Sequence, residues 1–276
     1  MILVVNPSTR SFPHALHRGA DPTTRQVGKG SLSPVTTELL RGYTDDIRQQ
    51  ATEKERKDRA KELWANRRQV RPALVAGLAE MAPGRERCMY CGDGQGTDID
   101  HFEPKSLAPL RTFDWLNHLL ACSFCNSNQK RNLFPTAADG SPLLVDPTAE
   151  DPLDHLRLVL PLGTYRGLTD RGRACIEVFG LNARAVLVKG RRDAHATARH
   201  SIELWRIAMD KGQRDKATEI VQVSWNRPLV DVLVAMFHQS GHPAADDLFA
   251  GEEEVLDLLL DAELRSAFLY FRGLSY

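Results

Sequence analysis

The chain contains 276 residues, and its 36 basic and 36 acidic side chains give a formal net charge of +0. Apolar residues make up 42% and charged residues 26%, which excludes a chain disordered throughout, a collagen-like fibre and a strongly basic, histone-like binder. No run of about 18 apolar residues occurs, and the first residues lack the basic segment and cleavage site of a signal peptide. We therefore expect a cytoplasmic protein without a membrane partner.

The neutral total hides an uneven distribution of charge along the sequence. Residues 1–80 carry a net charge of +5 and residues 181–243 carry +4, whereas residues 244–276 carry −6. The positive segments could hold a polyanion such as nucleic acid, while the acidic segment would face something else. The alternative is that each charged run is a solvated helix face.

The first 84 residues divide into two segments. Residues 1–33 are rich in Pro, Ser, Gly, Thr and Arg without a sustained period, which predicts an irregular N-terminal arm. Residues 34–84 have apolar residues at helical spacing, start after a Ser-Pro pair and stop at a Pro-Gly pair, which predicts an N-terminal helical segment.

A charged stretch occupies the middle of this helical segment. Residues 52–71 are dense in Lys, Arg and Glu, with Leu63 and Trp64 as the few large apolar residues. Pro72 then opens a second, short helix, because proline is tolerated in the first turn and not in a helix interior.

Residues 85–135 break the helical pattern with glycines and short apolar runs. The alternation in Thr97–Phe102 and the apolar run Leu119–Ala121 predict two short strands.

Residues 136–276 are predicted to be mostly helical. Near their start, His155–Leu160 predicts a strand that leads into a glycine-bounded turn at residues 163–167. The predicted helices are Ala174–Phe179, ending at Gly180, then Ala183–Ile207, Asp215–Phe237, broken near Pro228, and Ala245–Phe271. The expected fold class is therefore mainly α, with helices that flank a small, β-containing insert bearing a metal.

Four of the five cysteines form two pairs at the same C-x-x-C spacing. The pairs are Cys88 with Cys91 and Cys122 with Cys125, and 31 positions separate the second cysteine from the third. Two such knuckles can turn four sulfur atoms toward one point, so we expect a structural Zn²⁺ site. Disulfides and a redox C-x-x-C pair are the competing interpretations. Cys175 lies in an apolar stretch and is predicted to be a core residue.

The residues between and around the knuckles resemble the HNH endonuclease family. The sequence has Asp100-His101, then Asn117, then Cys122-Ser-Phe-Cys-Asn126, and the family pattern is Asp-His, Asn, and Cys-x-x-Cys followed by His or Asn, then Lys. The match covers residues 88–135. It implies that residues 85–135 form a ββα-metal finger, with two short antiparallel strands and a helix around one divalent ion.

The resemblance also implies a catalytic set of four residues. Asp100 and Asn126 would supply oxygen ligands to a catalytic Mg²⁺ or Mn²⁺, and His101 would take a proton from water as the general base. Asn117 would brace the loop that holds His101. Because Asp100 and His101 are neighbours on a predicted strand, they can share one phosphate only if the strand twists or ends there.

Three cations near this motif are candidates for binding phosphate, namely Lys105, Lys130 and Arg131. Lys130 lies one position beyond the Asn-x-x-Lys spacing of the family, which leaves Asn128 as an alternative to Asn126. We expect His118 to be structural.

Weaker resemblance extends through the rest of the chain. Leu144-Val-Asp-Pro147, Glu150-Asp-Pro152 and the stretch from Arg171 through Phe179-Gly-Leu-Asn182 to Arg192 are similar to an HNH subfamily of bacterial phage-defence operons, in Septu-type systems and some retrons. This resemblance implies an anti-phage role beside an ABC/SMC-like ATPase as protein partner.

Three functions are consistent with these patterns. The first is a metal-dependent endonuclease that hydrolyses DNA, the second is a non-catalytic zinc-knuckle module that binds nucleic acid or protein, and the third is an HNH nuclease acting on RNA. Only a nuclease would need the set formed by Asp100, His101 and Asn126.

The acidic C-terminal segment carries many large apolar residues. An apolar helix edged with acids predicts that residues 244–276 form a protein-docking surface. A terminal helix packed on the protein's own core is the alternative.

Overall fold

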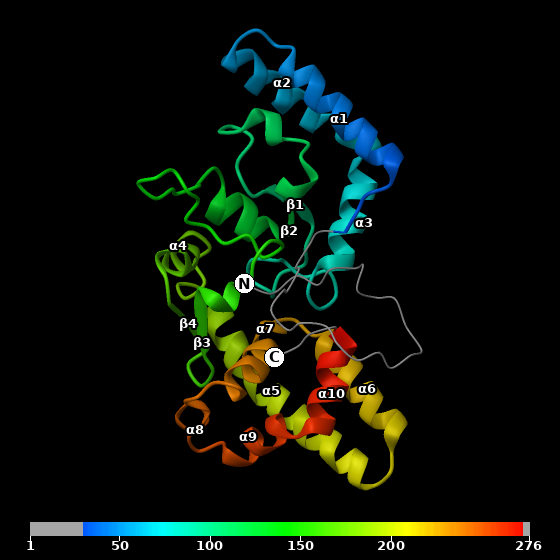
Figure 1. Cartoon of the computed structure of the whole chain (residues 1–276), viewed down its shortest axis with the longest axis vertical. Helices are drawn as coiled ribbons and strands as arrows, with labels where there is room; N and C mark the ends of the chain where they lie inside the picture. Colours follow the sequence, from blue (N-terminus) through cyan, green and yellow to red (C-terminus); the bar gives the residue numbers. More distant parts are fainter. Residues whose placement is uncertain (1–29, 273–276) are drawn as a thin grey trace, which may run out of the picture.

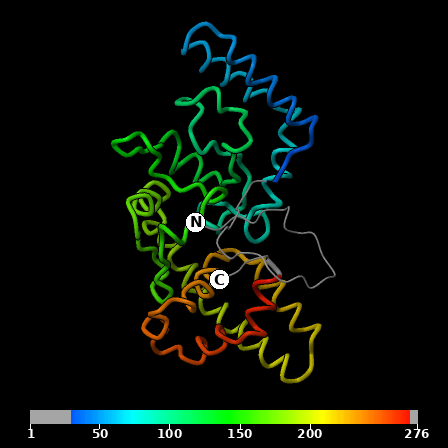
Figure 2. The backbone as a smooth tube through the Cα atoms, viewed as in Figure 1, coloured from blue at the N-terminus to red at the C-terminus, as the bar shows by residue number. Residues whose placement is uncertain are grey.

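The computed structural model describes residues 30–272, so residues 1–29 of the predicted N-terminal arm and residues 273–276 lie outside the described part. Helices dominate this part, and its strands form two separate two-stranded sheets. The segments follow one another along the long axis of the molecule. The helices of residues 34–65 lie at one end, a hairpin of residues 98–121 lies in the middle, and the helices of residues 185–272 lie at the other end (Figure 1, Figure 2).

The N-terminal helical segment forms as predicted, with a break earlier than Pro72. Ser33 caps the first helix by accepting a hydrogen bond from the Thr36 amide at 3.2 Å, and Thr52 and Glu55 form a capping box at the start of the second. The charged stretch stops being helical at Ala65, and a single 3-10 turn leads into the next helix. The bounds are α1 Pro34–Arg48, α2 Glu53–Ala65, η2 Arg67–Gln69 and α3 Arg71–Met81.

Both strands predicted between the cysteine pairs are confirmed. β1 (Asp98–His101) pairs antiparallel with β2 (His118–Ala121), so that Asp98 lies opposite Ala121 and His101 lies opposite His118. The 3-10 turns η3 (Pro109–Arg111) and η4 (Trp115–Asn117) lie in the loop between the strands, and the π-helix η5 (Phe124–Lys130) follows them. The predicted order of strand, strand and helix is therefore present. The preceding helix α3 packs against β2.

The second hairpin departs from the sequence-based prediction in one strand. β3 (Leu156–Val159) matches the predicted strand, but residues expected to form only a turn make β4 (Thr164–Gly167), which pairs antiparallel with β3. The turn itself is shorter and is closed by Gly163 at φ 67°. The preceding turn η6 is Pro152–Asp154, and the following helix α4 (Asp170–Val178) begins earlier than predicted because Thr169 caps it.

The C-terminal region is a bundle built around one long helix. α5 (Ala185–Asp210) packs against α6, α7 and α9. The predicted break near Pro228 separates α6 (Arg214–Trp225) from α7 (Asp231–Ser240), whereas the single helix predicted for residues 245–271 divides into three. Gly251 has a φ of 81° and Asp261 is extended, which ends the first two of them. Their bounds are α8 Ala245–Leu248, α9 Glu253–Leu260 and α10 Ala262–Arg272.

The apolar residues of the C-terminal segment lie inside the bundle. Those of α9 and α10 are buried against α5, α6 and α7, and the indole N–H of Trp225 donates to the Phe268 carbonyl at 2.9 Å. Only Leu260 and Tyr270 stand out as exposed large apolar side chains on these two helices, within the residues whose burial is described. The arrangement favours packing on the protein's own core over the predicted docking surface.

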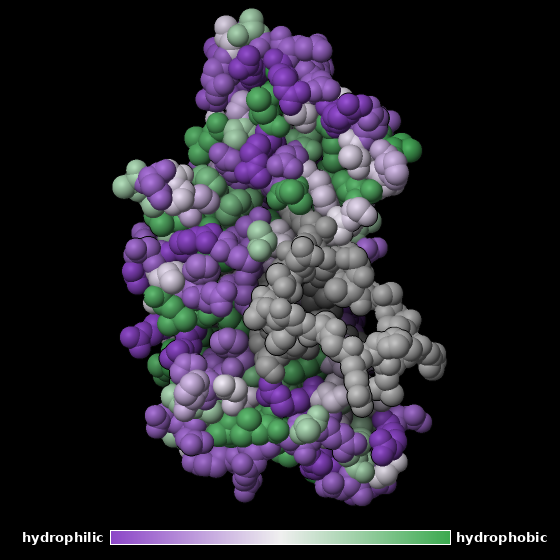
Figure 3. All heavy atoms as spheres, in the orientation of Figure 1, coloured by the Kyte–Doolittle hydropathy of each residue, from purple (hydrophilic) through white to green (hydrophobic). Residues whose placement is uncertain are grey.

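Polar residues cover much of the visible surface. On the face shown in Figure 3, hydrophilic residues dominate the α1–α2 end, and hydrophobic residues lie in separate small patches. Between residues 30 and 272, no helix combines the length and apolar character that crossing a membrane requires.

Candidate functional site

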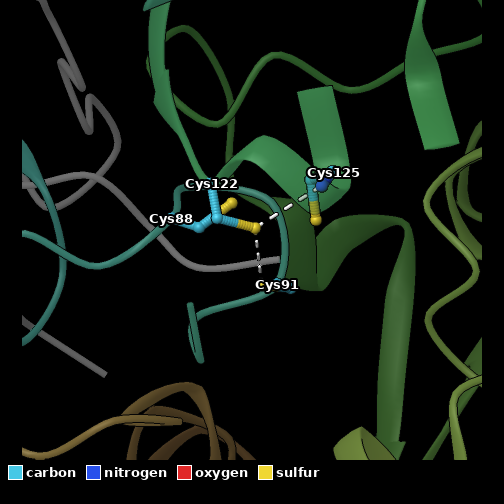
Figure 4. Close-up of side chains that lie close together, drawn as sticks. All are labelled: Cys88, Cys91, Cys122 and Cys125. Carbon is cyan, nitrogen blue, oxygen red and sulfur yellow. Dashed lines mark hydrogen bonds between the residues drawn. The ribbon is translucent and has the colours of Figure 1, made fainter. Parts of the chain in front are cut away.

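The four paired cysteines come together in the fold. Cys88 and Cys91 lie on the loop before β1, Cys122 directly follows β2, and Cys125 lies in the first turn of η5, with their sulfur atoms converging on one point (Figure 4). All four sulfur atoms lie within 4.8 Å of one another, and those of Cys91 and Cys122 are 3.9 Å apart. Four thiolates about 2.3 Å from a tetrahedral Zn²⁺ would be separated by about 3.8 Å. The cluster can therefore hold a metal ion such as zinc.

The spacing of the sulfur atoms argues against the disulfide interpretation. A disulfide would bring two sulfur atoms to about 2.05 Å, and every cysteine between residues 30 and 272 is a free thiol. The Arg184 guanidinium lies 3.7 Å from the Cys125 sulfur and offsets part of the negative charge of such a cluster.

Cys175 lies apart from the cluster, in the core, as predicted. It is fully buried, and its sulfur accepts a hydrogen bond from the Val145 amide at 3.3 Å. Burial raises the pKa of the Cys175 thiol to about 11, so this side chain stays protonated and is not a nucleophile.

A polar cavity of about 270 Å³ lies where the β1–β2 hairpin meets α2 and η5. Five of the predicted site residues line it, and these are Asp100, His101, Lys105, Asn126 and Arg131. A larger cavity of about 990 Å³ lies between α5 and the loop before β1, but it contains none of the predicted site residues. The smaller cavity is the candidate site because the predicted site residues line it, although the other cavity has the larger volume.

Of the lining residues that were not predicted as site residues, four carry a charged or aromatic side chain. Trp64, Arg67 and Arg71 come from the N-terminal helical segment, and Asp98 comes from the start of β1. Asp98 could have been found from the sequence, because residues two apart on a strand share one face and Asp100 was already a candidate.

The His101 side chain is held in one orientation. Its Nε2 lies 3.0 Å from the carbonyl oxygen of Thr112, and its ring centroid lies 4.3 Å from that of Trp64. Because a carbonyl oxygen only accepts hydrogen bonds, Nε2 carries the proton and Nδ1 is the basic nitrogen. Burial, with contributions from His118 and Lys105, lowers the pKa of His101 well below its usual value, so the ring stays neutral at neutral pH.

β1 ends at His101, so Asp100 and His101 can both face one cavity although they are adjacent residues of a strand. His101 is the last residue of β1, and both His101 and Asp100 line the cavity although they are neighbours in the chain. His118, opposite His101 on β2, also has its Nε2 near the Thr112 carbonyl, at 2.9 Å, but it does not line the cavity. This placement agrees with the structural role expected for His118.

Asn117 braces the loop that carries the Thr112 carbonyl. Its Oδ1 accepts a hydrogen bond from the Glu103 amide at 2.8 Å, and its Nδ2 donates to the carbonyls of Glu103 and Arg111 at 3.0 Å each. The side chain is fully buried and does not reach the cavity. Asn117 thus holds the carbonyl of Arg111, the residue before Thr112, whose own carbonyl lies 3.0 Å from His101 Nε2.

We expect Asn117→Ala to destabilise the protein by at least about 2 kcal/mol, because it removes the hydrogen-bond partner of three part-buried backbone groups and each lost partner costs about 1–3 kcal/mol. Thermal unfolding would measure the loss, with Asn132→Ala, an exposed asparagine on the same cavity, as the matched control. Equal melting temperatures for the two variants would contradict this role of Asn117.

Asp100 is buried and bound through one carboxylate oxygen. Its Oδ2 accepts the Tyr90 hydroxyl at 2.5 Å and lies 3.0 Å from the Lys130 ammonium. Burial raises the pKa of Asp100, and Lys130 and Tyr90 oppose that effect. Tyr90 lies between Cys88 and Cys91 in the sequence, so its hydrogen bond to Asp100 connects the cysteine cluster directly to the cavity.

Lys130 is placed differently from a phosphate ligand. It is fully buried, pairs with Asp100 and donates to the His101 carbonyl at 2.6 Å. The π-helical form of η5, which takes one more residue per hydrogen-bonded turn than an α-helix, places Lys130 at the buried end of this element. The Lys130 ammonium already binds Asp100 and the His101 carbonyl and does not line the cavity, so the prediction that it binds phosphate is not supported. The phosphate candidates that line the cavity are Lys105 and Arg131.

Asn126, and not Asn128, reaches the cavity. Its Nδ2 donates to Asp98 Oδ2 at 3.2 Å, and its Oδ1 accepts no hydrogen bond from residues 30–272. Asn128 is exposed and does not line the cavity. The amide oxygen of Asn126 therefore has no hydrogen-bond donor within residues 30–272, in a cavity that Asp98 and Asp100 also line.

No protein-family model matches the chain, and no curated protein is significantly similar to it. The functional assignment therefore rests on the residues of the site.

Proposed function

We propose that the protein is a metal-dependent endonuclease of the HNH type that hydrolyses DNA phosphodiester bonds, with His101 as the general base. One observation carries the proposal, namely that the Thr112 carbonyl fixes the His101 tautomer in the cavity that also holds Asp100 and Asn126. A basic nitrogen beside oxygen ligands for a hard cation is the minimum equipment for hydrolysing a phosphodiester.

The cavity offers oxygen atoms of the kind that a hard divalent cation takes as ligands. Asp100 offers its Oδ1, because Tyr90 and Lys130 both bind Oδ2, and Asn126 offers its unpartnered amide oxygen. Asp98 adds a second carboxylate to the same cavity. A bound Mg²⁺ or Mn²⁺ would polarise the scissile phosphate and stabilise the departing 3′ oxygen.

The remaining steps belong to the side chains of the protein. His101 takes a proton from the attacking water at Nδ1, and the Thr112 carbonyl holds the resulting imidazolium through Nε2–H. Lys105 and Arg131 bind the charged phosphate oxygens at the edge of the cavity. A module that only bound nucleic acid would have no use for a neutral, oriented histidine beside carboxylates. The anti-phage role, and an ABC/SMC-like ATPase partner, stay predictions from the family resemblance.

We expect Asp100→Ala and Asn126→Ala to slow plasmid cleavage at low Mg²⁺ or Mn²⁺ and to recover part of the rate as the metal concentration rises, because each removes one ligand oxygen. Asn128→Ala is the matched control, since it changes an exposed asparagine on the same helix. Steady-state rates measured across a metal titration test this prediction. A larger defect in Asn128→Ala than in Asn126→Ala would contradict the proposed ligand set.

A further inference from the structure

The N-terminal helical segment builds one wall of the cavity. The Trp64 ring contacts the His101 ring edge-on, with centroids 4.3 Å apart, and the Arg67 guanidinium lies 4.2 Å from the Trp64 ring centroid. Arg67 also donates from Nη1 to the Trp64 carbonyl at 2.5 Å. These contacts form a stack of Arg67, Trp64 and His101 that holds the guanidinium in place at the cavity.

The cations of the cavity form no close ion pair within residues 30–272, although Asp98 and Asp100 line the same cavity. Four cations line it, and they are Arg67, Arg71, Lys105 and Arg131. None of them lies within 4.0 Å of a carboxylate oxygen from residues 30–272, whereas other arginines in the same region, such as Arg59, form ion pairs.

Arg67 is the most constrained of the four. Its side chain is half-buried, and its Nε is buried without a hydrogen-bond partner among residues 30–272. Burial, together with the neighbouring charge of Arg71, lowers the pKa of Arg67, and Asp98 opposes that effect. Arg71 makes one long hydrogen bond, 3.4 Å, to the Thr97 carbonyl. Two guanidinium groups at the same cavity, neither of them in a close ion pair with residues 30–272, are suited to an anion.

We propose that Arg67 and Arg71 form a phosphate-binding subsite that grips the backbone of the nucleic acid strand entering the cavity. This inference rests on the proposed function, since it names the phosphodiester as the ligand. The guanidinium fork binds two phosphate oxygens at once, and stacking on Trp64 removes much of the conformational entropy that an arginine otherwise loses on binding. The subsite reads no bases, so its effect on affinity is the same for all sequences.

The test compares Arg67→Gln and Arg71→Gln with Arg68→Gln, a neighbouring exposed arginine that does not line the cavity. Binding of a fluorescent DNA duplex and of an RNA strand is measured across a salt series without added divalent metal. We expect each of the first two variants to bind roughly tenfold more weakly at low salt, with a salt slope smaller by about 0.9 per lost phosphate contact. Arg68→Gln should match the wild type, and Arg67→Lys should keep the wild-type slope.

Binding without metal separates this subsite from the reaction. If wild-type protein binds nucleic acid and the slopes change as expected, but Mg²⁺ or Mn²⁺ produces no cleavage, the subsite stands and the proposed function fails. Wild-type affinity and slope in both Arg67→Gln and Arg71→Gln, with unchanged melting temperature and zinc content, would overturn the subsite. A wild-type protein that binds neither DNA nor RNA would overturn it as well. Whichever probe shows the change in slope identifies the source of the phosphate.

Discussion

Replacing His101 with alanine will lower the rate of DNA cleavage by roughly 10²–10⁴, the usual contribution of a general base, while DNA binding is retained. The variant removes the only imidazole of residues 30–272 that lines the cavity. The loss should appear in the rate constant of the cleavage step, because the side chain takes a proton and holds no phosphate. Single-turnover cleavage of a supercoiled plasmid measures that step.

His118→Ala is the matched control for this experiment. His118 pairs with His101 across the hairpin, shares its Thr112 acceptor and also contacts Trp64, with ring centroids 5.3 Å apart. The two substitutions remove similar buried packing, so their melting temperatures should fall by similar amounts, but only His101→Ala loses the base. Equal rates for the two variants would remove His101 from the mechanism.

Replacing Cys122 with serine will unfold the finger and abolish metal binding. The hairpin has few large apolar residues of its own, and a structural Zn²⁺ site contributes on the order of 10–16 kcal/mol of apparent binding energy in small fingers. Loss of the finger's structure will also disturb the cavity, because Tyr90 in the first knuckle donates a hydrogen bond to Asp100. We expect the wild-type protein to purify with about one zinc per chain and Cys122→Ser to purify without it.

Cys175→Ser provides the control for the loss of a buried thiol. Cys175 is as buried as the cluster cysteines but binds only the Val145 amide, an interaction that a serine hydroxyl can also accept. Its zinc content should equal that of the wild type. Full-strength cleavage by a zinc-free Cys122→Ser protein would contradict a structural metal in the finger.

Local sequence signals predicted the centre of the candidate site well. The spacing of the cysteine pairs placed the metal cluster, and the alternation around Asp100 and His101 placed the strand that carries them. These features depend on residues close together in the chain, where periodicity and motif spacing carry the information. The position of Asn126 directly after the fourth cysteine likewise fixed its place at the start of the helix.

The wall of the cavity could not be predicted in the same way. Trp64 was recognisable as an isolated large apolar residue in a charged helix, but nothing in the sequence named His101 as the ring it packs against. Arg67 and Arg71 resembled the other cations of a solvated face. The burial of Lys130 depends on a π-helical turn that propensities do not reveal.

The C-terminal segment shows the limit of composition as a guide to surfaces. Its acids and apolar residues suggested a docking helix, yet Leu259, Leu264 and Phe268 are fully buried. An apolar stripe predicts burial without saying whether the covering surface belongs to the same chain. Here α5, α6 and α7 supply that surface.

The most direct test of the account is cleavage of supercoiled plasmid by zinc-loaded wild-type protein with and without added Mg²⁺ or Mn²⁺. We expect the supercoiled plasmid to be converted to nicked or linear DNA only when the metal is added, with 5′-phosphate and 3′-hydroxyl ends. Intact DNA after incubation of a folded, zinc-loaded protein with either metal, while His101→Ala gives the same result, would contradict the proposed activity.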